Sequence, residues 1–143
     1  MYKINISSHT LHFLLPAGTS RGVYTTRKSY YVTLSDTNQP DVVGIGECAT
    51  LPDLSCDAMS DEEYEQKLRS FCDDFCRTGI IDIDAMRPYP SMLFGLETAK
   101  AQLDAKGSIN FFNTAFGRGE EGITINGLVW MGTFEEMYQR LEE

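Results

Sequence analysis

Two stretches of this sequence bring together residue types that could carry chemistry, and both are predicted to be loops at the ends of strands. Val43–Ser55, VGIGECATLPDLS, is an apolar strand that runs into glycines, a glutamate and a proline-containing loop. Pro16–Tyr24, PAGTSRGVY, places one arginine between two glycines. Neither stretch holds a complete set of catalytic residues, so we interpret both as loops that a small scaffold presents to another part of a site.

The charged residue in each stretch also has a structural interpretation. The local chemistry alone favours a solvated arginine in an ordinary hairpin loop for Arg21. The loop is nevertheless long for a hairpin connection, and long loops often bind ligands. Glu47 lies where a strand ends and could act as an acid or base. A structural carboxylate, bonded to the backbone of the neighbouring loop or to Arg21, is the favoured interpretation.

Metal-binding and phosphate-binding patterns are weak. Cys72 and Cys76 lie four residues apart on a predicted helix, but they continue an apolar stripe and both histidines lie far upstream. We therefore expect buried, reduced thiols.

Asp82 and Asp84 lack the further oxygen ligands of a calcium loop and are interpreted as solvated residues or helix caps. The glycines of GIGEC do not complete a dinucleotide-binding motif.

Composition narrows the class of partner. The 143 residues carry 12 Lys and Arg against 21 Asp and Glu, a formal charge of −9. Such a chain repels nucleic-acid phosphates, so no nucleic-acid partner is expected. No apolar run approaches the roughly 20 residues of a membrane span. The N-terminus lacks the pattern of a secretory signal, so we expect a cytoplasmic protein that is not bound to a membrane.

Three predicted strands would position the two loops. Tyr2–Leu15 alternates apolar and polar residues, which predicts one kinked strand or two short ones, stopped by Pro16. Ser29–Leu34 is rich in β-branched and aromatic residues and predicts a second strand. Val42–Cys48 is the third. Because turn residues separate them, we expect a three-stranded antiparallel meander.

Two helices are predicted to follow, giving an α+β fold with a small helical bundle over residues 1–110. Ser60 and Glu63 form a capping box, and Gly79 is expected to end the first helix. Ser91 is expected to cap a second helix, Met92–Lys106. The first helix carries an apolar stripe formed by Tyr64, Leu68, Phe71, Cys72 and Phe75.

Residues 111–143 have a different character. Ile123–Met131 is nearly all apolar without alternation, which is typical of a parallel strand buried on both faces. Thr133 is then expected to cap a helix in which the sequence stops. One such strand and helix cannot form a sheet alone, so we expect the first β/α unit of a larger repeat that is cut off. The exposed strand predicts either self-association into a homo-oligomer or packing on the chain's own sheet.

This order of parts resembles the enolase superfamily, in which an α+β capping domain covers the mouth of a (β/α) barrel. Ser91–Leu103 resembles the third capping helix, Val43–Ser55 the strand and loop ending in G-E-x-x-x-L-P, and Ile123–Met131 the first barrel strand. PAGTSRGVY, GIGECATLPDLS and INGLVWMG most resemble the o-succinylbenzoate synthase family of menaquinone biosynthesis. Relatives similar to muconate cycloisomerase or dipeptide epimerase share most of this scaffold.

The resemblance implies the capping, substrate-specificity domain of a Mg²⁺-dependent lyase. Such an enzyme removes a proton α to a carboxylate and then loses water, with lysines and metal carboxylates on barrel strands. Those strands are absent here, so we expect no catalytic or metal-binding residue and no activity from the chain alone. The implied partners are the missing barrel domain and a small carboxylate substrate. The alternative from another class is a stand-alone α+β binding module.

The resemblance also assigns substrate contacts to the two loops. Arg21 is expected to bind a substrate carboxylate, since a guanidinium matches that geometry, while pairing with Glu47 or another acid remains open. Trp130 and Met131 end the predicted barrel strand and are expected to be buried packing residues. The expected substrate-binding residues are Thr19, Ser20, Arg21 and Gly22 of the first loop, with Leu51 and Pro52 of the second as an apolar wall.

Overall fold

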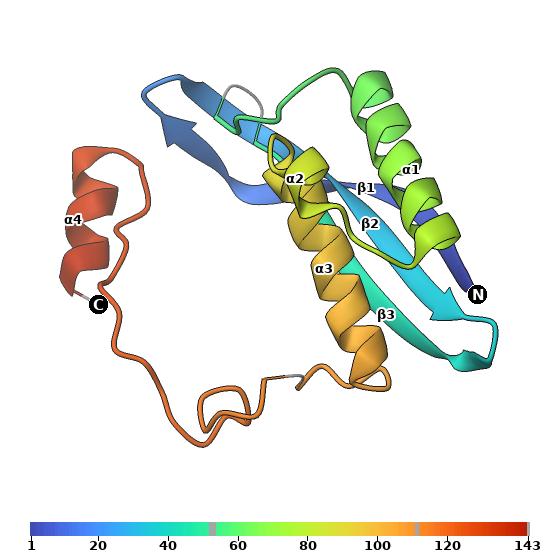
Figure 1. Cartoon of the computed structure of the whole chain (residues 1–143). Helices are drawn as coiled ribbons and strands as arrows, with labels where there is room; N and C mark the ends of the chain where they lie inside the picture. Colours follow the sequence, from blue (N-terminus) through green and yellow to red (C-terminus); the bar gives the residue numbers. More distant parts are fainter. Residues whose placement is uncertain (52–53, 111, 143) are drawn as a thin grey trace.

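The computed structural model describes residues 1–51, 54–110 and 112–142. The strands are β1 (Tyr2–Thr19), β2 (Gly22–Asp36) and β3 (Gln39–Ala49), and the helices are α1 (Asp61–Thr78), α2 (Ile83–Met86), α3 (Pro90–Asp104) and α4 (Phe134–Glu142). The strands form one antiparallel sheet in the order β1-β2-β3, and the helices follow them (Figure 1). This confirms the predicted α+β class. No described helix is both long and apolar enough to cross a bilayer.

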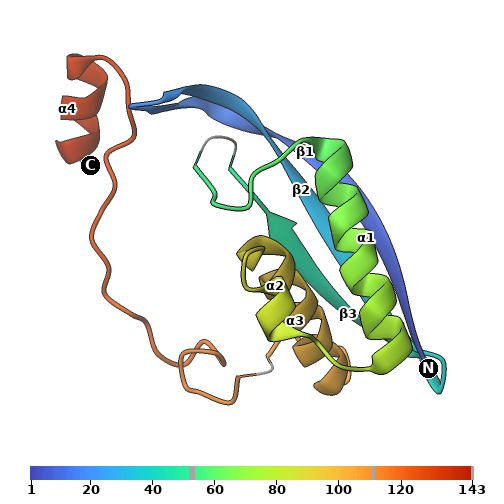
Figure 2. The same ribbon diagram turned by 45° about the horizontal axis from the view of Figure 1, so that its top comes forward.

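One face of the sheet is covered by α1 and α3 (Figure 2). Tyr30, Val32 and Leu34 alternate along β2 and are buried. On β1, Ile4 and Ile6 stand opposite Leu34 and Val32 and pack against the same core. The two-residue period of a strand puts these side chains on one face, as the sequence pattern predicted.

The contact between β3 and α3 depends on glycines. A Cβ atom on Gly46 would overlap the carbonyl oxygen of Gly95, and one on Gly44 would overlap that of Ala99. A Cβ on Gly95 would likewise overlap the Sγ atom of Cys48. The helix backbone therefore lies directly on the strand, which explains why glycines alternate in GIGEC without any nucleotide-binding role.

The predicted start of α1 is confirmed. The Oγ atom of Ser60 accepts the Glu63 backbone N–H at 3.3 Å, and the Glu63 carboxylate accepts the Ser60 N–H at 3.2 Å. This capping box satisfies two of the backbone N–H groups that a helix leaves without partners at its first turn. The stripe that follows is also confirmed, since Tyr64, Leu68 and Phe75 are buried.

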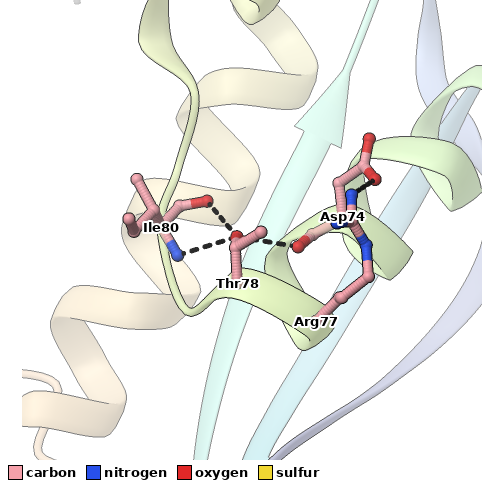
Figure 3. A network of polar contacts seen from close by, with 4 residues as sticks. All are labelled: Asp74, Arg77, Thr78 and Ile80. Carbon is pink, nitrogen blue, oxygen red and sulfur yellow. Dashed lines mark hydrogen bonds and ion pairs between the residues drawn. The ribbon is translucent and has the colours of Figure 1, made fainter.

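The end of α1 is held by a network of polar contacts (Figure 3). The Thr78 hydroxyl donates to the Asp74 carbonyl at 2.8 Å and accepts the Ile80 N–H at 3.2 Å. The Arg77 guanidinium pairs with the Asp74 carboxylate at 2.7 Å. Gly79, with φ of 72°, takes the left-handed conformation that ends the helix, as predicted.

The predicted cap of the second long helix is wrong. Helix α3 begins at Pro90, its N-cap residue is Tyr89, and no side chain of that residue caps it. The N–H and hydroxyl of Ser91, inside the first turn, both donate to the carboxylate of Asp57, at 2.8 and 2.6 Å. The preformed φ of proline suits the first helical position, and a buried carboxylate from the loop between β3 and α1 replaces the expected cap.

The predicted end of the first strand at Pro16 is also wrong, because β1 continues to Thr19. The pairing shifts between His12 and Ala17, so residues 13–16 stand against only Thr25 of β2. Such a bulge accommodates a proline, which has no N–H to give to the ladder. Strand β2 therefore starts well before the predicted Ser29.

The predicted buried strand in the C-terminal part, Ile123–Met131, is an extended segment without strand partners in the described part of this structure. Ile125 and Leu128 expose 81% and 80% of their surface, and the segment is extended without ladder pairing. A strand buried on both faces needs neighbouring strands, and the described part of the chain places none beside it. Helix α4 does begin at the predicted cap: the Thr133 hydroxyl accepts the Glu136 N–H at 3.3 Å.

Candidate functional site

The first predicted loop is a tight turn at the tip of a long hairpin. Strands β1 and β2 remain paired as far as Thr19 and Gly22, so only Ser20 and Arg21 form the turn. The Thr19 hydroxyl accepts the Arg21 N–H at 3.1 Å and donates to the Gly22 carbonyl at 3.2 Å. The expectation of a long loop is therefore corrected, while its four site residues do lie together and are exposed.

The second predicted loop follows the end of β3, and Leu51 and Ser55 are joined by two hydrogen bonds. The N–H of Leu51 donates to the Ser55 hydroxyl at 2.9 Å, and the Leu51 carbonyl accepts the Ser55 N–H at 3.0 Å. Leu51 is half-buried, and Pro52 lies outside the described residues. Strand β3 ends at Ala49 opposite Ser29, about 26 Å along β2 from the turn at Arg21. Because β3 is antiparallel to β2, the chain leaves Ala49 in the direction of the hairpin tip.

The structural interpretation of Glu47 is confirmed, but with a different partner. Its carboxylate accepts the hydroxyl of Ser29 at 2.7 Å, and Ser29 has no exposed surface. Glu47 stands opposite Tyr31 in the sheet, roughly 30 Å along β2 from the turn. Pairing between Glu47 and Arg21, one of the alternatives for both residues, is therefore wrong.

A pocket of about 460 Å³ lies between the end of β3, the second loop and the start of α3. The Nε atom of Arg27, on β2, is buried there without a hydrogen-bond partner among the described residues. Asp57 is 3% exposed and binds the first turn of α3. Sequence reasoning missed both residues, because neither belongs to a periodic pattern. The polar lining includes Arg27, Glu47, Ser55, Asp57 and Ser91.

The cysteines have the environments of packing residues. Burial raises the pKa of the Cys48 and Cys72 thiols to about 12, so both stay protonated near neutral pH. Cys76 is half-buried and free. Among residues 1–51, 54–110 and 112–142, no group of three or more His, Cys, Asp or Glu side chains is placed to hold a metal ion.

The two aspartates of IIDIDAM have the roles expected of caps and solvated residues. Asp82 is the N-cap of α2 and accepts the Ala85 N–H at 3.0 Å. Asp84 pairs with Arg87 at 3.0 Å, and its side chain is 91% exposed. These contacts confirm the structural interpretation of the pair.

Trp130 and Met131 contact the first hairpin instead of lying in a barrel core. The indole N–H of Trp130 donates to the carbonyl of Pro16 at 3.2 Å. Met131 packs over Gly18. Trp130 is half-buried and Met131 is 53% exposed, so the expectation of buried packing is wrong for Met131 and only partly met by Trp130. The apolar pattern of Ile123–Met131 could not predict the contact with the first hairpin, because the two parts are distant in the sequence.

The sequence is similar to one curated protein and matches no family model. It is 31% identical, over an alignment of 161 residues, to an o-succinylbenzoate synthase of Desulfotalea psychrophila. That alignment covers 92% of this chain and 43% of the relative, so the chain spans less than half of the protein it matches.

Two solved structures share the fold. An enolase family member from Agrobacterium tumefaciens, with homology to dipeptide epimerases and with bound sodium and L-Ala-L-Glu, matches with a TM-score of 0.69. It is 16% identical, and the match covers 98% of this chain and 42% of that one. A mandelate racemase/muconate lactonizing protein from Herpetosiphon aurantiacus matches with a TM-score of 0.52, 16% identity, and coverage of 71% and 29%.

Proposed function

We infer that this chain, which has the N-terminal capping-domain fold of the enolase superfamily, is the substrate-specificity part of an o-succinylbenzoate synthase-like dehydratase. The observation that carries this proposal is the 31% identity to an o-succinylbenzoate synthase over 92% of the chain. In the proposal, residues 1–110 form the capping domain and residues 111–143 form a linker and the first β/α unit of a barrel. A cytoplasmic location and a place in menaquinone biosynthesis belong to the same proposal.

The chemistry of such a lyase is proton removal α to a carboxylate, followed by loss of water. A bound Mg²⁺ would stabilise the charge that develops on the carboxylate oxygens. The described residues do not fit a Mg²⁺ site, since no three candidate ligands come together. The proposal therefore assigns the metal ligands and the catalytic lysines to a barrel outside these 143 residues, and the chain alone would have no activity.

Substrate contact is the part of the reaction that we assign to this chain. The turn at Ser20 and Arg21 is tied by the Thr19 hydroxyl, so the backbone that carries the guanidinium is preorganised. We propose that Arg21 binds a carboxylate of the substrate, with Thr19, Ser20 and Gly22 around it. Leu51, with Pro52, would supply an apolar wall from the second loop.

A dipeptide epimerase-like function is the second candidate. The structure with the TM-score of 0.69 belongs to a protein with homology to dipeptide epimerases and holds L-Ala-L-Glu. Both reactions begin with removal of a proton α to a carbonyl group, but an epimerase returns a proton and loses no water. The two candidates therefore differ in product, which one assay series can separate.

The test uses a longer protein in which the encoding gene is read in frame past codon 143. We expect Mg²⁺-dependent dehydration that yields o-succinylbenzoate. Replacing Arg21 by Met should raise KM roughly tenfold to a hundredfold, the value of a hydrogen bond to a charged group. Arg69→Met is the matched control, because Arg69 lies exposed on α1 and pairs only locally with Glu65.

Each result of this test decides between the candidates. Epimerisation of dipeptides without dehydration would replace the first candidate by the second. Absence of both activities in a folded, Mg²⁺-loaded longer protein would contradict both candidates. An equal effect of Arg21→Met and Arg69→Met would remove the proposed role of Arg21.

A further inference from the structure

The hairpin of β1 and β2 extends beyond β3, and its outer part meets the segment that precedes α4 (Figure 2). The bulge at residues 13–16 interrupts the ladder there, and a bulge leaves backbone groups without strand partners. The Pro16 carbonyl is in this interrupted stretch. It accepts the indole N–H of Trp130, a residue 114 positions away in sequence, at 3.2 Å.

A second contact lies beside the first. A Cβ atom on Gly18 would come within 2.9 Å of the Sδ atom of Met131, so the missing side chain leaves room for the thioether. Trp130 and Met131 thus contact β1 at Pro16 and Gly18, two residues apart on that strand. Together they contact the last residues of β1 before the turn that carries Arg21.

Helix α4 binds the backbone of Trp130 and Met131. The Arg140 guanidinium donates to the Trp130 carbonyl at 2.6 Å and to the Met131 carbonyl at 3.2 Å. The capping box of Thr133 and Glu136 fixes the first turn of the same helix, with the Thr133 N–H donating to the Glu136 carboxylate at 2.8 Å. The backbone of the Trp130–Met131 pair is therefore tied to an ordered element.

We propose that Trp130 is a positioning residue for the hairpin tip, residues 19–22, which it holds through the Pro16 carbonyl. A two-stranded ribbon without a third strand or a covering helix is only marginally stable, so an outside contact decides its orientation. This inference rests on the proposed function in one respect: the tip matters for catalysis only if Arg21 binds substrate. The contact itself is a property of this chain.

The first experiment is amide hydrogen exchange on the 143-residue chain. Trp130→Phe keeps an aromatic ring and removes the N–H, and we expect amides of residues 17–24 to exchange about fivefold faster. Amides of residues 30–34, in the core of β2, should be unchanged. Met131→Ala, which removes the second contact, should act in the same direction.

The matched control is Phe134→Leu, since Phe134 follows four residues after Trp130, is 78% exposed and stacks on Tyr138 within α4. It should leave exchange of the hairpin unchanged. Unchanged exchange in both Trp130→Phe and Met131→Ala would overturn the positioning role, and so would an equal effect of Phe134→Leu.

In the longer protein, Trp130→Phe should raise KM severalfold and leave kcat nearly unchanged. The same substitution in an Arg21→Met background should have no further effect on KM, because both changes act through the tip. Additive effects would overturn the role. A longer protein without activity would contradict the proposed function, and the exchange result would then decide the positioning role by itself.

Discussion

Strand β2 and the segment Ile123–Met131 are both rich in apolar residues, but their environments are opposite. Val32 and Leu34 have no exposed surface, whereas Ile125 and Leu128 expose 81% and 80%. The pattern of apolar residues predicts which side chains of a segment lie on the same face. Burial itself also needs a partner surface. Helices α1 and α3 supply one to the sheet, whereas Ile125 and Leu128 have none in the described part of the chain.

The sharpest test of this difference uses glycines. Gly46→Ala should lower the free energy of unfolding by about 4 kcal/mol or more, because the new methyl group would overlap the carbonyl of Gly95 and neither backbone can move aside. Gly127→Ala is the matched change, since nothing lies within 4 Å of its Cβ position. It should change stability by less than about 0.5 kcal/mol. Urea unfolding measures both, and equal losses would contradict the comparison.

Leucines give the second test. Leu96→Ala should cost about 3 kcal/mol, the sum of lost apolar burial and the cavity that remains in a core where Leu96 has no exposed surface. Leu128→Ala removes the same atoms from a side chain that is 80% exposed, and its cost should be within about 0.5 kcal/mol. Thermal and urea unfolding of the two variants measure the difference. A loss of 2 kcal/mol or so in Leu128→Ala would show that its segment is packed in solution.

The buried thiols predict a loss of stability in alkali. The ordinary thiol pKa is 9.0, and burial raises it to about 12 for Cys48 and Cys72. Above pH 9 the unfolded chain releases these protons and the folded chain keeps them, so the stability falls as pH rises from 9 towards 12. At pH 10 the loss should be about 1.4 kcal/mol for each thiol.

The measurement is the urea midpoint at pH 8 and at pH 10. Cys72→Ala should remove about half of the pH dependence, whatever it does to stability at pH 8. Cys56→Ala is the control, because this cysteine is exposed. An identical pH dependence in the wild-type chain and Cys72→Ala would show that Cys72 is accessible to solvent.

The two capping boxes give the smallest expected effect. Ser60→Ala should destabilise the fold by about 1 kcal/mol, since α1 is packed on the core. Thr133→Ala removes the same kind of cap from α4, which has no buried residue, and should leave the global unfolding midpoint unchanged while lowering local helicity. Unfolding curves and helix-specific hydrogen exchange separate the two. Equal shifts in midpoint would indicate that α4 unfolds together with the core.

Local signals were enough to predict much of the fold. The capping box at Ser60, the stop at Gly79, the alternation in β1 and the β-branched and aromatic run in β2 each depend on residues a few positions apart. The structure confirms all four. The same logic failed at Pro16, because a bulge lets a strand continue past a proline. It also failed at Ser91, where the group that binds the helix start, Asp57, comes from a distant loop.

Less of the candidate site was predictable. The four tip residues were correctly grouped, because a turn is local. The partner of Glu47, the buried Nε atom of Arg27 and the contact of Trp130 with Pro16 all join residues that the register of the sheet or the path of the chain brings together. No spacing rule within one segment contains that information.

The position of the core along the chain also sets an order of events during synthesis. The buried cluster and the residues packed on it run from Tyr2 to Leu103 in the described part of the chain. A ribosome releases the chain from its N-terminus. Every residue of that core therefore emerges before Trp130 does. The hairpin tip would then be held only late in translation, so a nascent chain should acquire its protease-resistant sheet before its ordered tip.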